Sequence, residues 1–494
     1  MGLIKKQSIS GTIYSYVGVI LGFVTTAILY PRVFSTEEVG LLRILVSYSL
    51  LFAQFSGLGI TSVTIRLFPY FRDYERKHHG YLGLALLVSL IGLIISVSTF
   101  ILMKSSILGG DKEGSDLFAH YFYYIVPLII ATLLFNVFDT YYRVLYNAVK
   151  GIIYKEVIQR VFILAVIILY FLNTITFHQA VVLYTIALIS PTILLFISLI
   201  YNKQLFITPD FSFIDRKLGK EIISVGVFGI LASFSSVLVM TIDTIMVERT
   251  LGLSDAGIYS ITFFFGTLIL VPLRTMGKIS SVVIADAWKV NDISIINQIY
   301  KKSGVSLSIV GLLLLIGIWG NIDNIFYIIS DDYLPGKYVI LLIGIANLSD
   351  ISLGVSSHII VNSIYYRFLS YILFIFAALL IISNLILIPI YGIVGAAIAT
   401  LISKYIFNLI KYLFLYKKYK LQPFTTKTPL LYLIGAIAYG ASLLLPEQQN
   451  FIVDIIVRSS IILVVFSAPV YYFKISEDIN QKVESVVKSL FTHR

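Results

Sequence analysis

Long apolar runs separated by short polar segments are the dominant pattern of this chain. A run of about 20 apolar residues is long enough to cross about 30 Å of hydrocarbon as an α-helix. Counting such runs predicts about fourteen membrane-spanning helices, in the windows 9–30, 40–64, 81–103, 119–141, 156–173, 178–201, 221–247, 257–279, 303–321, 337–360, 367–389, 392–416, 429–446 and 452–473. The pattern therefore predicts an all-α integral membrane protein.

Two polar turns in this pattern are copies of each other. RVFSTEEVG at 32–40 and RTLGLSDAG at 249–257 share an Arg, a Gly and an acidic residue two positions before the Gly, at a shift of 217 residues from Gly40 to Gly257. After a small adjustment, ITSVTI at 60–65 matches ISSVVI at 279–284. We interpret the chain as a duplication of a six-helix lobe, with two C-terminal helices added.

The duplication and the polar breaks predict the domain organisation. We expect an N-lobe at 1–203, a cytoplasmic amphipathic linker at 204–220, a C-lobe at 221–424, the two added helices at 425–473 and a cytoplasmic tail at 474–494. The first apolar run is too long for a signal-peptide core and lacks a small-residue cleavage site, so it is expected to be a retained helix. Glycines 18 and 22 in this helix predict close helix packing.

Composition supports a membrane protein, with 58% hydrophobic and 13% charged residues and a mean hydropathy of +0.93. The net charge of +11 arises from Lys and Arg concentrated in alternate loops, which places both termini in the cytoplasm by the positive-inside rule. Because the basic residues lie in loops beside apolar helices, we expect them to contact anionic membrane lipids, and we expect no nucleic-acid partner. The chain has no cysteine, which excludes disulfides, thiolate metal sites and thiol catalysis.

Several enzyme classes are disfavoured by the loops. The longest external loop, 104–118, leaves no room for the external segment that a polymerase, ligase or glycosyltransferase would fold around its active site. No P-loop pattern occurs, and no His, Asp and Glu group has metal-ligand spacing, so we expect neither ATP hydrolysis nor a fixed metal. These features favour a transporter over an enzyme.

Charged residues within membrane helices are costly and are therefore functional candidates. Asp350 and Lys404 lie about 18 Å into their predicted helices, close to the midplane. Each belongs to a stripe of polar positions three and four apart, namely Asn347, Asp350, Gly354 and Ser357 on one helix and Lys404, Asn408 and Lys411 on the other. These stripes are expected to face protein or water, and Asp350 and Lys404 either form a buried ion pair or serve a substrate or ion.

Other intramembrane charges are nearer to helix ends. Arg143, Arg160, Arg274 and Arg458 are expected to reach the interface with their long side chains. Arg43 and Asp243 are different, because in the duplication Arg43 lies opposite Ser260 and Asp243 lies opposite Thr26. The two charges break the internal symmetry, which marks both positions as functional candidates.

The order of these motifs resembles a known family. The turns RVFSTEEVGLLR and DTIMVERTLGLSDAGIYS and the run YGIVGAAIATLISK are similar to the polysaccharide transport and O-antigen flippase branch of the multidrug, oligosaccharidyl-lipid and polysaccharide (MOP) exporter superfamily. This resemblance implies two lobes around a central cavity, a MATE-like fold in a bacterial inner membrane. It also implies an undecaprenyl-pyrophosphate-linked oligosaccharide as substrate, and a polysaccharide polymerase and glycosyltransferases as partners.

The resemblance also suggests roles for the charged residues. A pyrophosphate needs a cationic path, for which Arg43 and Lys404 are the first candidates, Arg274 is a weaker third, and Arg32 and Arg249 lie at the outer mouth. Asp243 and Asp350 are candidates for binding a coupling cation, Na⁺ or H⁺, or for holding the basic groups in place, and no other cofactor is implied.

Two other functions remain as alternatives at this point. A cation-coupled multidrug exporter has the same fold, and two membrane acids would suit it, but the two added C-terminal helices favour the polysaccharide branch. A membrane transferase of envelope polysaccharide synthesis is disfavoured by the short external loops and by the duplication.

Overall fold

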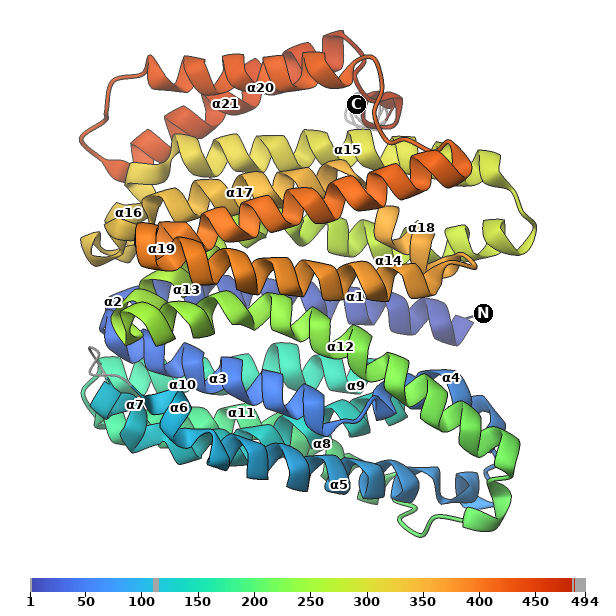
Figure 1. Ribbon diagram of the computed structural model, residues 1–494. Helices are drawn as coiled ribbons and strands as arrows, with labels where there is room; N and C mark the ends of the chain where they lie inside the picture. The colour runs from blue at the N-terminus through green and yellow to red at the C-terminus, as the bar shows by residue number, and fades with distance from the viewer. Residues whose placement is uncertain (1, 110–114, 482–483, 485–494) are drawn as a thin grey trace, which may run out of the picture. The chain divides into compact units, whose positions relative to one another are not determined.

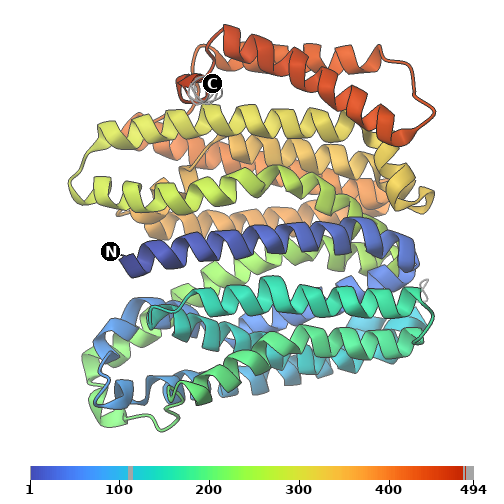
Figure 2. The same ribbon diagram turned by 180° about the vertical axis from the view of Figure 1, so that it is seen from behind.

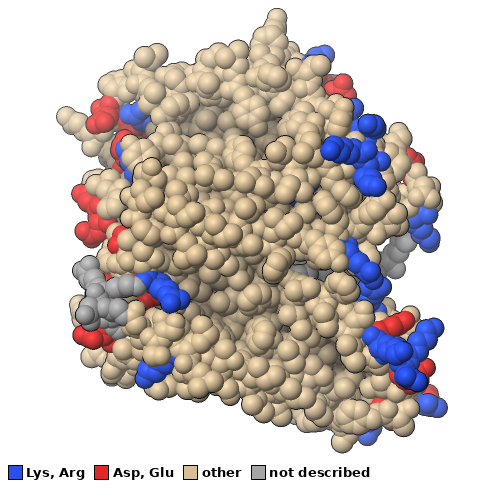
Figure 3. Space-filling view, viewed as in Figure 1, with Lys and Arg blue, Asp and Glu red and all other residues tan. Residues whose placement is uncertain are grey.

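The computed structural model describes residues 2–109, 115–481 and 484, and every regular element in these ranges is a helix (Figure 1). The chain forms two compact units, Met1–Ser260 and Ile261–Arg494, which are described separately. On the face shown in Figure 3, the charged side chains gather at the ends of the helices and leave uncharged surface between them. This distribution confirms the predicted all-α membrane protein.

The first unit is built from long helices with short caps between them. They are α1 (Gly2–Phe23), η1 (Val24–Leu29), α2 (Tyr30–Val33), α3 (Thr36–Ser56), α4 (Ile60–Phe71), α5 (Tyr81–Leu102), α6 (Lys104–Leu108), α7 (Ser115–Tyr121), α8 (Ile125–Val144), α9 (Val149–Ile152), η4 (Ile153–Ile158), α10 (Gln159–Phe171), α11 (Phe177–Tyr201), α12 (Arg216–Leu251) and the start of α13 (Leu253–Thr267). Helix α3 begins with a capping box, in which Ser35 and Glu38 satisfy each other's backbone N–H groups.

Two of these helical runs contain π-helical turns. Helix α1 continues through the π-turn η1 into α2, and α9 continues through the π-turn η4 into α10. Figure 2 shows α1, in dark blue, lying along the second run, and η4 contacts α1. A Cβ at Gly18 would lie 2.7 Å from Glu156 Cβ, and one at Gly22 would overlap the Arg160 guanidinium, so the predicted close packing of these glycines is confirmed.

The second unit contains the remaining helices. They are the end of α13, α14 (Val271–Lys289), α15 (Ile293–Gly320), α16 (Ile322–Ile329), α17 (Lys337–Ser352), α18 (Ser356–Asn362), α19 (Tyr366–Tyr419), α20 (Thr428–Leu443) and α21 (Phe451–Tyr472). Within α19 the chain folds back at Gly392, whose φ of 60° is accessible to glycine at little cost. A Cβ at Gly395 would overlap the carbonyl of Leu387, which shows how sharp this bend is.

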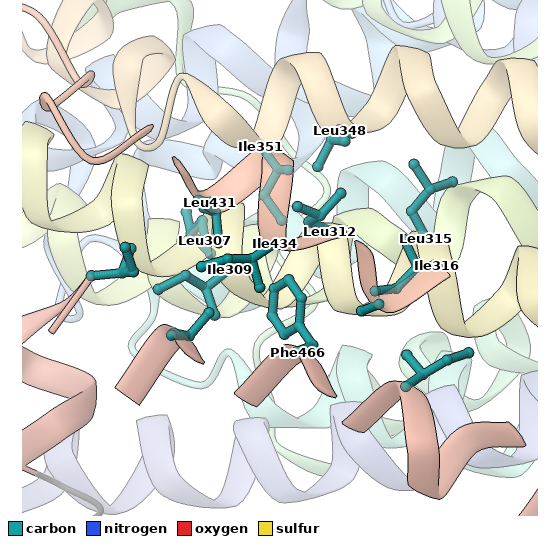
Figure 4. Packing of buried hydrophobic residues seen from close by; sticks show 14 of the residues in the cluster. Leu307, Ile309, Leu312, Leu315, Ile316, Leu348, Ile351, Leu431, Ile434 and Phe466 are labelled. Carbon is teal, nitrogen blue, oxygen red and sulfur yellow. The ribbon is translucent and has the colours of Figure 1, made fainter. Parts of the chain in front are cut away.

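The last two helices pack on the second unit through an apolar cluster. Phe466 of α21 and Ile434 of α20 lie against Leu312 of α15 and Ile351 of α17 (Figure 4). Burial of such side chains contributes about 1.5–3 kcal/mol each relative to exposure in water, and less in a membrane, where lipid offers a comparable apolar environment. Packing complementarity therefore matters more here than apolarity.

The predicted number of fourteen spanning helices is not confirmed. Among the described residues, 11 helices are long and apolar enough to cross a membrane. The windows 367–389 and 392–416 share the 54-residue element α19, the window 429–446 is the shorter α20, and the window 156–173 lies in the run interrupted by η4. The domain boundaries at 204–220 and 425 come from the sequence repeat, whereas the two compact units come from contacts, so those boundaries stay predictions.

Candidate functional site

A cluster of three charged side chains lies in the second unit, where α17 packs against the C-terminal half of α19. Asp350 of α17 accepts a hydrogen bond from Lys411 Nζ to its Oδ1 at 2.9 Å. Lys404 Nζ lies 3.7 Å from the other carboxylate oxygen, Oδ2. One carboxylate is therefore shared between two lysines from one helix.

The two lysines have different surroundings. The Lys411 side chain is 1% exposed, donates a second hydrogen bond to Ser357 Oγ at 3.3 Å, and lies 4.6 Å from the centre of the Phe407 ring. The Lys404 side chain is 15% exposed. Lys411 is therefore enclosed by its partners, whereas part of Lys404 remains accessible.

The amide side chain of Asn347 orients Lys404. Its Nζ donates to Asn347 Oδ1 at 2.5 Å, and the Asn347 amide donates to the Gly266 carbonyl at 2.8 Å, which fixes which side of the amide faces the lysine. One turn further along α19, Asn408 donates to Ser349 Oγ at 2.8 Å. Asn347 and Asp350 of α17 thus face the polar stripe of α19, as predicted. The expectation that Gly354 and Ser357 continue the same helix was wrong, because α17 ends at Ser352, Gly354 has a positive φ, and Ser357 lies on α18.

The cluster carries an excess positive charge. One carboxylate and two ammonium groups sum to +1, and exposed Arg274 on α14 adds a repulsive electrostatic interaction with Lys404. An uncompensated charge within a membrane protein is costly unless a counter-charge is provided. The arrangement can therefore accept an anionic group at Lys404.

Arg43 lies in the first unit, on α3, with two buried nitrogen atoms that are not hydrogen-bonded. Its Nε and Nη2 find no acceptor among the described residues, and its guanidinium carbon lies 5.3 Å from the centre of the Tyr30 ring. Buried polar groups are almost always paired, so this one is a binding candidate. The polar pattern identified Arg43 from its broken symmetry alone.

The remaining candidates in the first unit have different environments. Asp243 is buried and accepts a hydrogen bond from Tyr259 Oη at 2.9 Å. Arg249 is exposed at the end of α12 and donates to Ser106 Oγ at 3.3 Å, and Arg32 is exposed on α2. The structure does not bring Asp243, Arg249 or Arg32 together with the Asp350 cluster within one unit.

Two arginines form ion pairs with acids on their own helical runs. Arg160 lies about 16 Å from the start of the helical run α9–η4–α10, and pairs with Glu156 at 2.8 Å, because the run begins at Val149, upstream of the predicted window. Arg458 is 9% exposed and donates from Nε and Nη2 to Asp454. In both pairs the acid lies four residues earlier in the same helical run, a spacing that the sequence already showed, and the expectation that these arginines reach the interface stays a prediction.

Comparisons with known proteins agree with this architecture. The sequence model of a family described as "Polysaccharide biosynthesis protein" matches residues 4–284, more than half of the chain. No curated protein sequence matches.

Several solved structures share the fold at low sequence identity. A lipid II flippase, MurJ, in an inward closed conformation superposes with a TM-score of 0.69 at 17% identity, covering 95% of this chain and 99% of that one. An inward-facing multidrug resistance MATE family transporter gives 0.60 at 14%, covering 82% and 94%. A MOP superfamily transporter from Pyrococcus furiosus gives 0.55 at 14%, covering 85% and 95%. The chain therefore belongs to the polysaccharide biosynthesis protein family and has the fold of MOP superfamily flippases and transporters.

Proposed function

We propose that this protein is a flippase that moves an undecaprenyl-pyrophosphate-linked oligosaccharide, an O-antigen or related surface polysaccharide unit, between leaflets. Transport runs from the cytoplasmic to the outer leaflet of a bacterial inner membrane by alternating access, with both termini in the cytoplasm. The protein acts without covalent chemistry, between the glycosyltransferases that build the unit and the polymerase that consumes it.

The observation that carries this proposal is the excess positive charge of the Lys404–Asp350–Lys411 cluster. A pyrophosphate is anionic and forms strong charge-assisted hydrogen bonds with ammonium and guanidinium groups. Lys404 is the accessible cation of the cluster, and Arg43 offers two nitrogen atoms, Nε and Nη2, that have no acceptor among the described residues. In the proposed mechanism each of these residues contacts the pyrophosphate from its own unit at some stage of transport.

The other candidates have supporting roles. Arg274 adds positive charge near Lys404, and exposed Arg32 and Arg249 attract the substrate at the outer ends of their helices. Asp350 holds the two lysines in place. Asp243 is the candidate for a coupling cation, Na⁺ or H⁺.

A multidrug exporter of the same fold is the second candidate, because two MATE or MOP transporters superpose well on the chain. An exporter of cationic drugs needs an available carboxylate in its binding site. Asp350 is already engaged by two lysines, which disfavours cation binding there.

Complementation tests the proposal. In cells that lack their O-antigen flippase, we expect the wild-type chain to restore surface polysaccharide, and Lys404→Ala or Arg43→Ala to reduce it about tenfold, because each removes a charge-assisted contact. Lys337→Ala is the matched control, since Lys337 pairs with Asp323 on the surface at 2.7 Å.

The outcome separates the candidates. Normal polysaccharide in both variants, at equal membrane levels of protein, contradicts the assigned path. Failure of the wild-type chain combined with export of a cationic dye would support the drug exporter instead.

A further inference from the structure

The turn between α4 and α5 has an unusual backbone. In this short turn, η2 (Lys77–Gly80), all four residues have a positive φ, between 49° and 63°. Such left-handed backbone is open to glycine but strained for a residue with a side chain, and three of the four have one. Strained residues in succession persist only where surrounding contacts hold them, and they point to a mechanical role.

The contacts come from residues 204–213, which belong to the connection between α11 and α12 and are called the strap below. The Asp210 N–H donates to the His79 carbonyl at 3.1 Å, and the Gly83 N–H donates to the Phe206 carbonyl at 3.1 Å. Gly83 lies in the first turn of α5, where N–H groups have no partner within the helix. The strap is therefore bonded to the strained turn and also caps the helix that follows it.

Two glycines allow the strap to approach this closely. A Cβ at Gly80 would overlap the Thr208 carbonyl oxygen, and a Cβ at Gly83 would overlap the Ile207 carbonyl oxygen. Gly83 has an ordinary helical backbone, so only its contact with the strap requires glycine there. Backbone thus meets backbone at two successive points.

The His79 side chain adds a lateral contact. It is 6% exposed, and its ring stacks on the ring of Phe213 in the strap, with the ring centres 3.7 Å apart. His79 Nδ1 lies 3.4 Å from Asp210 Oδ2. The Phe213 ring also lies against Phe71 at the end of α4, with the ring centres 5.1 Å apart. The strap is therefore held by side chains as well as by backbone.

The neighbouring histidine closes the turn from inside. His78 is fully buried, and its Nδ1 accepts a hydrogen bond from the Asp73 N–H at 3.2 Å. Its ring lies between Phe68 of α4 and Phe206 of the strap, with ring centres 5.4 Å and 6.0 Å away. Both histidines of the strained turn therefore contact the strap.

We propose that the turn Lys77–Gly80 is a permanent clamp, which keeps the strap fixed to the first unit in every state of the transport cycle. Contact between two backbones leaves no side chain that could swing aside to release the strap. Release would also remove the contacts that hold three strained residues. Helix α12 therefore begins from a fixed point, whichever molecule the protein transports.

Limited proteolysis of the purified full-length protein in detergent tests the contact. Chymotrypsin cleaves after aromatic residues in segments that open locally, and Phe206 and Phe213 lie in the strap. We expect Gly83→Ala to speed cleavage of the strap about tenfold, although alanine favours a helix more than glycine does. Gly219→Ala is the matched control and keeps the wild-type rate, since a Cβ there would lie 3.8 Å from Ile214, an ordinary contact.

Cross-linking tests whether the clamp stays closed. His79→Cys with Phe213→Cys replaces the stacked rings by two thiols in a chain that has no other cysteine. A short, membrane-permeant bifunctional thiol reagent joins the thiols in cells, and the number of free thiols that remain measures the reaction. We expect the joined protein to restore surface polysaccharide at least as well as the untreated variant. The two single cysteine variants are the controls for the reagent.

Three results would overturn the clamp. The first is cleavage of the strap at the wild-type rate in Gly83→Ala or, if that variant does not fold, in Phe213→Ala, where cleavage after Phe206 is measured. The second is thiols that do not join. The third is loss of transport on joining, with unchanged transport in the single variants, because the strap would then have to leave the turn. If the wild-type chain restores no polysaccharide, the proposed function fails, and proteolysis and thiol joining alone decide the clamp.

Discussion

Asp350 is contacted by two lysines that are not equivalent. Lys411 is 1% exposed and lies 2.9 Å from the carboxylate, whereas Lys404 is 15% exposed, lies 3.7 Å away and is also bonded to Asn347. Removing one partner of a buried pair is more damaging than removing both. We infer that Lys411 serves as the counter-ion of Asp350 and that Lys404 is the cation available to a ligand.

This division of roles predicts different outcomes for two double variants of equal net charge. Asp350→Asn with Lys411→Met removes the closer pair and leaves Lys404, so transport should stay within about threefold of wild type. Asp350→Asn with Lys404→Met leaves only Lys411, and transport should fall about tenfold, the loss expected for one charge-assisted contact. Surface polysaccharide at matched protein levels is the measurement.

Because the two variants have the same net charge, a general effect of charge would affect both equally. Equal transport in the two would therefore disprove the division of roles. The flippase proposal itself is tested separately, by complementation with the wild-type chain.

At the scale of helices, the two copies of the repeated turn contact each other within the first unit. A Cβ at Gly40 would overlap the Leu253 carbonyl, and a Cβ at Gly257 would overlap the Thr36 carbonyl. Thr36 and Leu253 are equivalent in the duplication, as are Gly40 and Gly257, so the contact is reciprocal. Glycine is needed at both positions because backbone meets backbone, and the Thr36 and Ser254 hydroxyls lie 2.8 Å apart beside them.

This contact can be fixed chemically, because the chain contains no cysteine. We expect Thr36→Cys with Ser254→Cys to form a disulfide under mild oxidation, since the two side chains are close enough for its geometry. If transport requires α3 and α13 to separate, oxidation should abolish transport and a reductant should restore it. Each single cysteine variant is the control.

Normal transport with the disulfide formed would show that the contact stays closed throughout the cycle. Failure to form the disulfide would instead contradict the arrangement of the two helix ends.

At the scale of the whole molecule, uncharged surface between the charged helix ends indicates how the helices lie in a membrane (Figure 3). The loops rich in Lys and Arg predict a cytoplasmic linker at 204–220 and an external segment at 104–118. Residues 202–215 connect α11, which ends at Tyr201, to α12, which begins at Arg216, and the segment 104–118 contains α6 and the start of α7. The side of the membrane on which each segment lies stays a prediction.

Single cysteines in the cysteine-free chain test this orientation. Ser105→Cys, at an exposed position, should react with a membrane-impermeant maleimide in intact cells, whereas Thr208→Cys, also exposed, should react only after permeabilisation. Labelling of Thr208→Cys in intact cells would reverse the assigned orientation.

The sequence by itself determined the features that depend on local composition. Helical class, most of the spanning segments and the polar stripes of α17 and α19 follow from apolar run length and from residue spacing. The family was recognisable from the repeated turns, and Arg43 from its broken symmetry, because both are properties of order along the chain.

Tertiary structure decided which side chains meet and how far each is buried. Residue spacing placed Lys411 in a polar stripe, but it did not show that Lys411 lies closer to Asp350 than Lys404 does. That difference depends on how the two helices are rotated against each other, which is fixed by packing. The fold-back at Gly392 and the early start at Val149, which places Arg160 inside a helical run, likewise depend on neighbouring helices. Hydrophobicity specifies that a segment enters the membrane. Contacts between segments specify how each helix is rotated and shifted against its neighbours, and this placement determines which charged side chains meet.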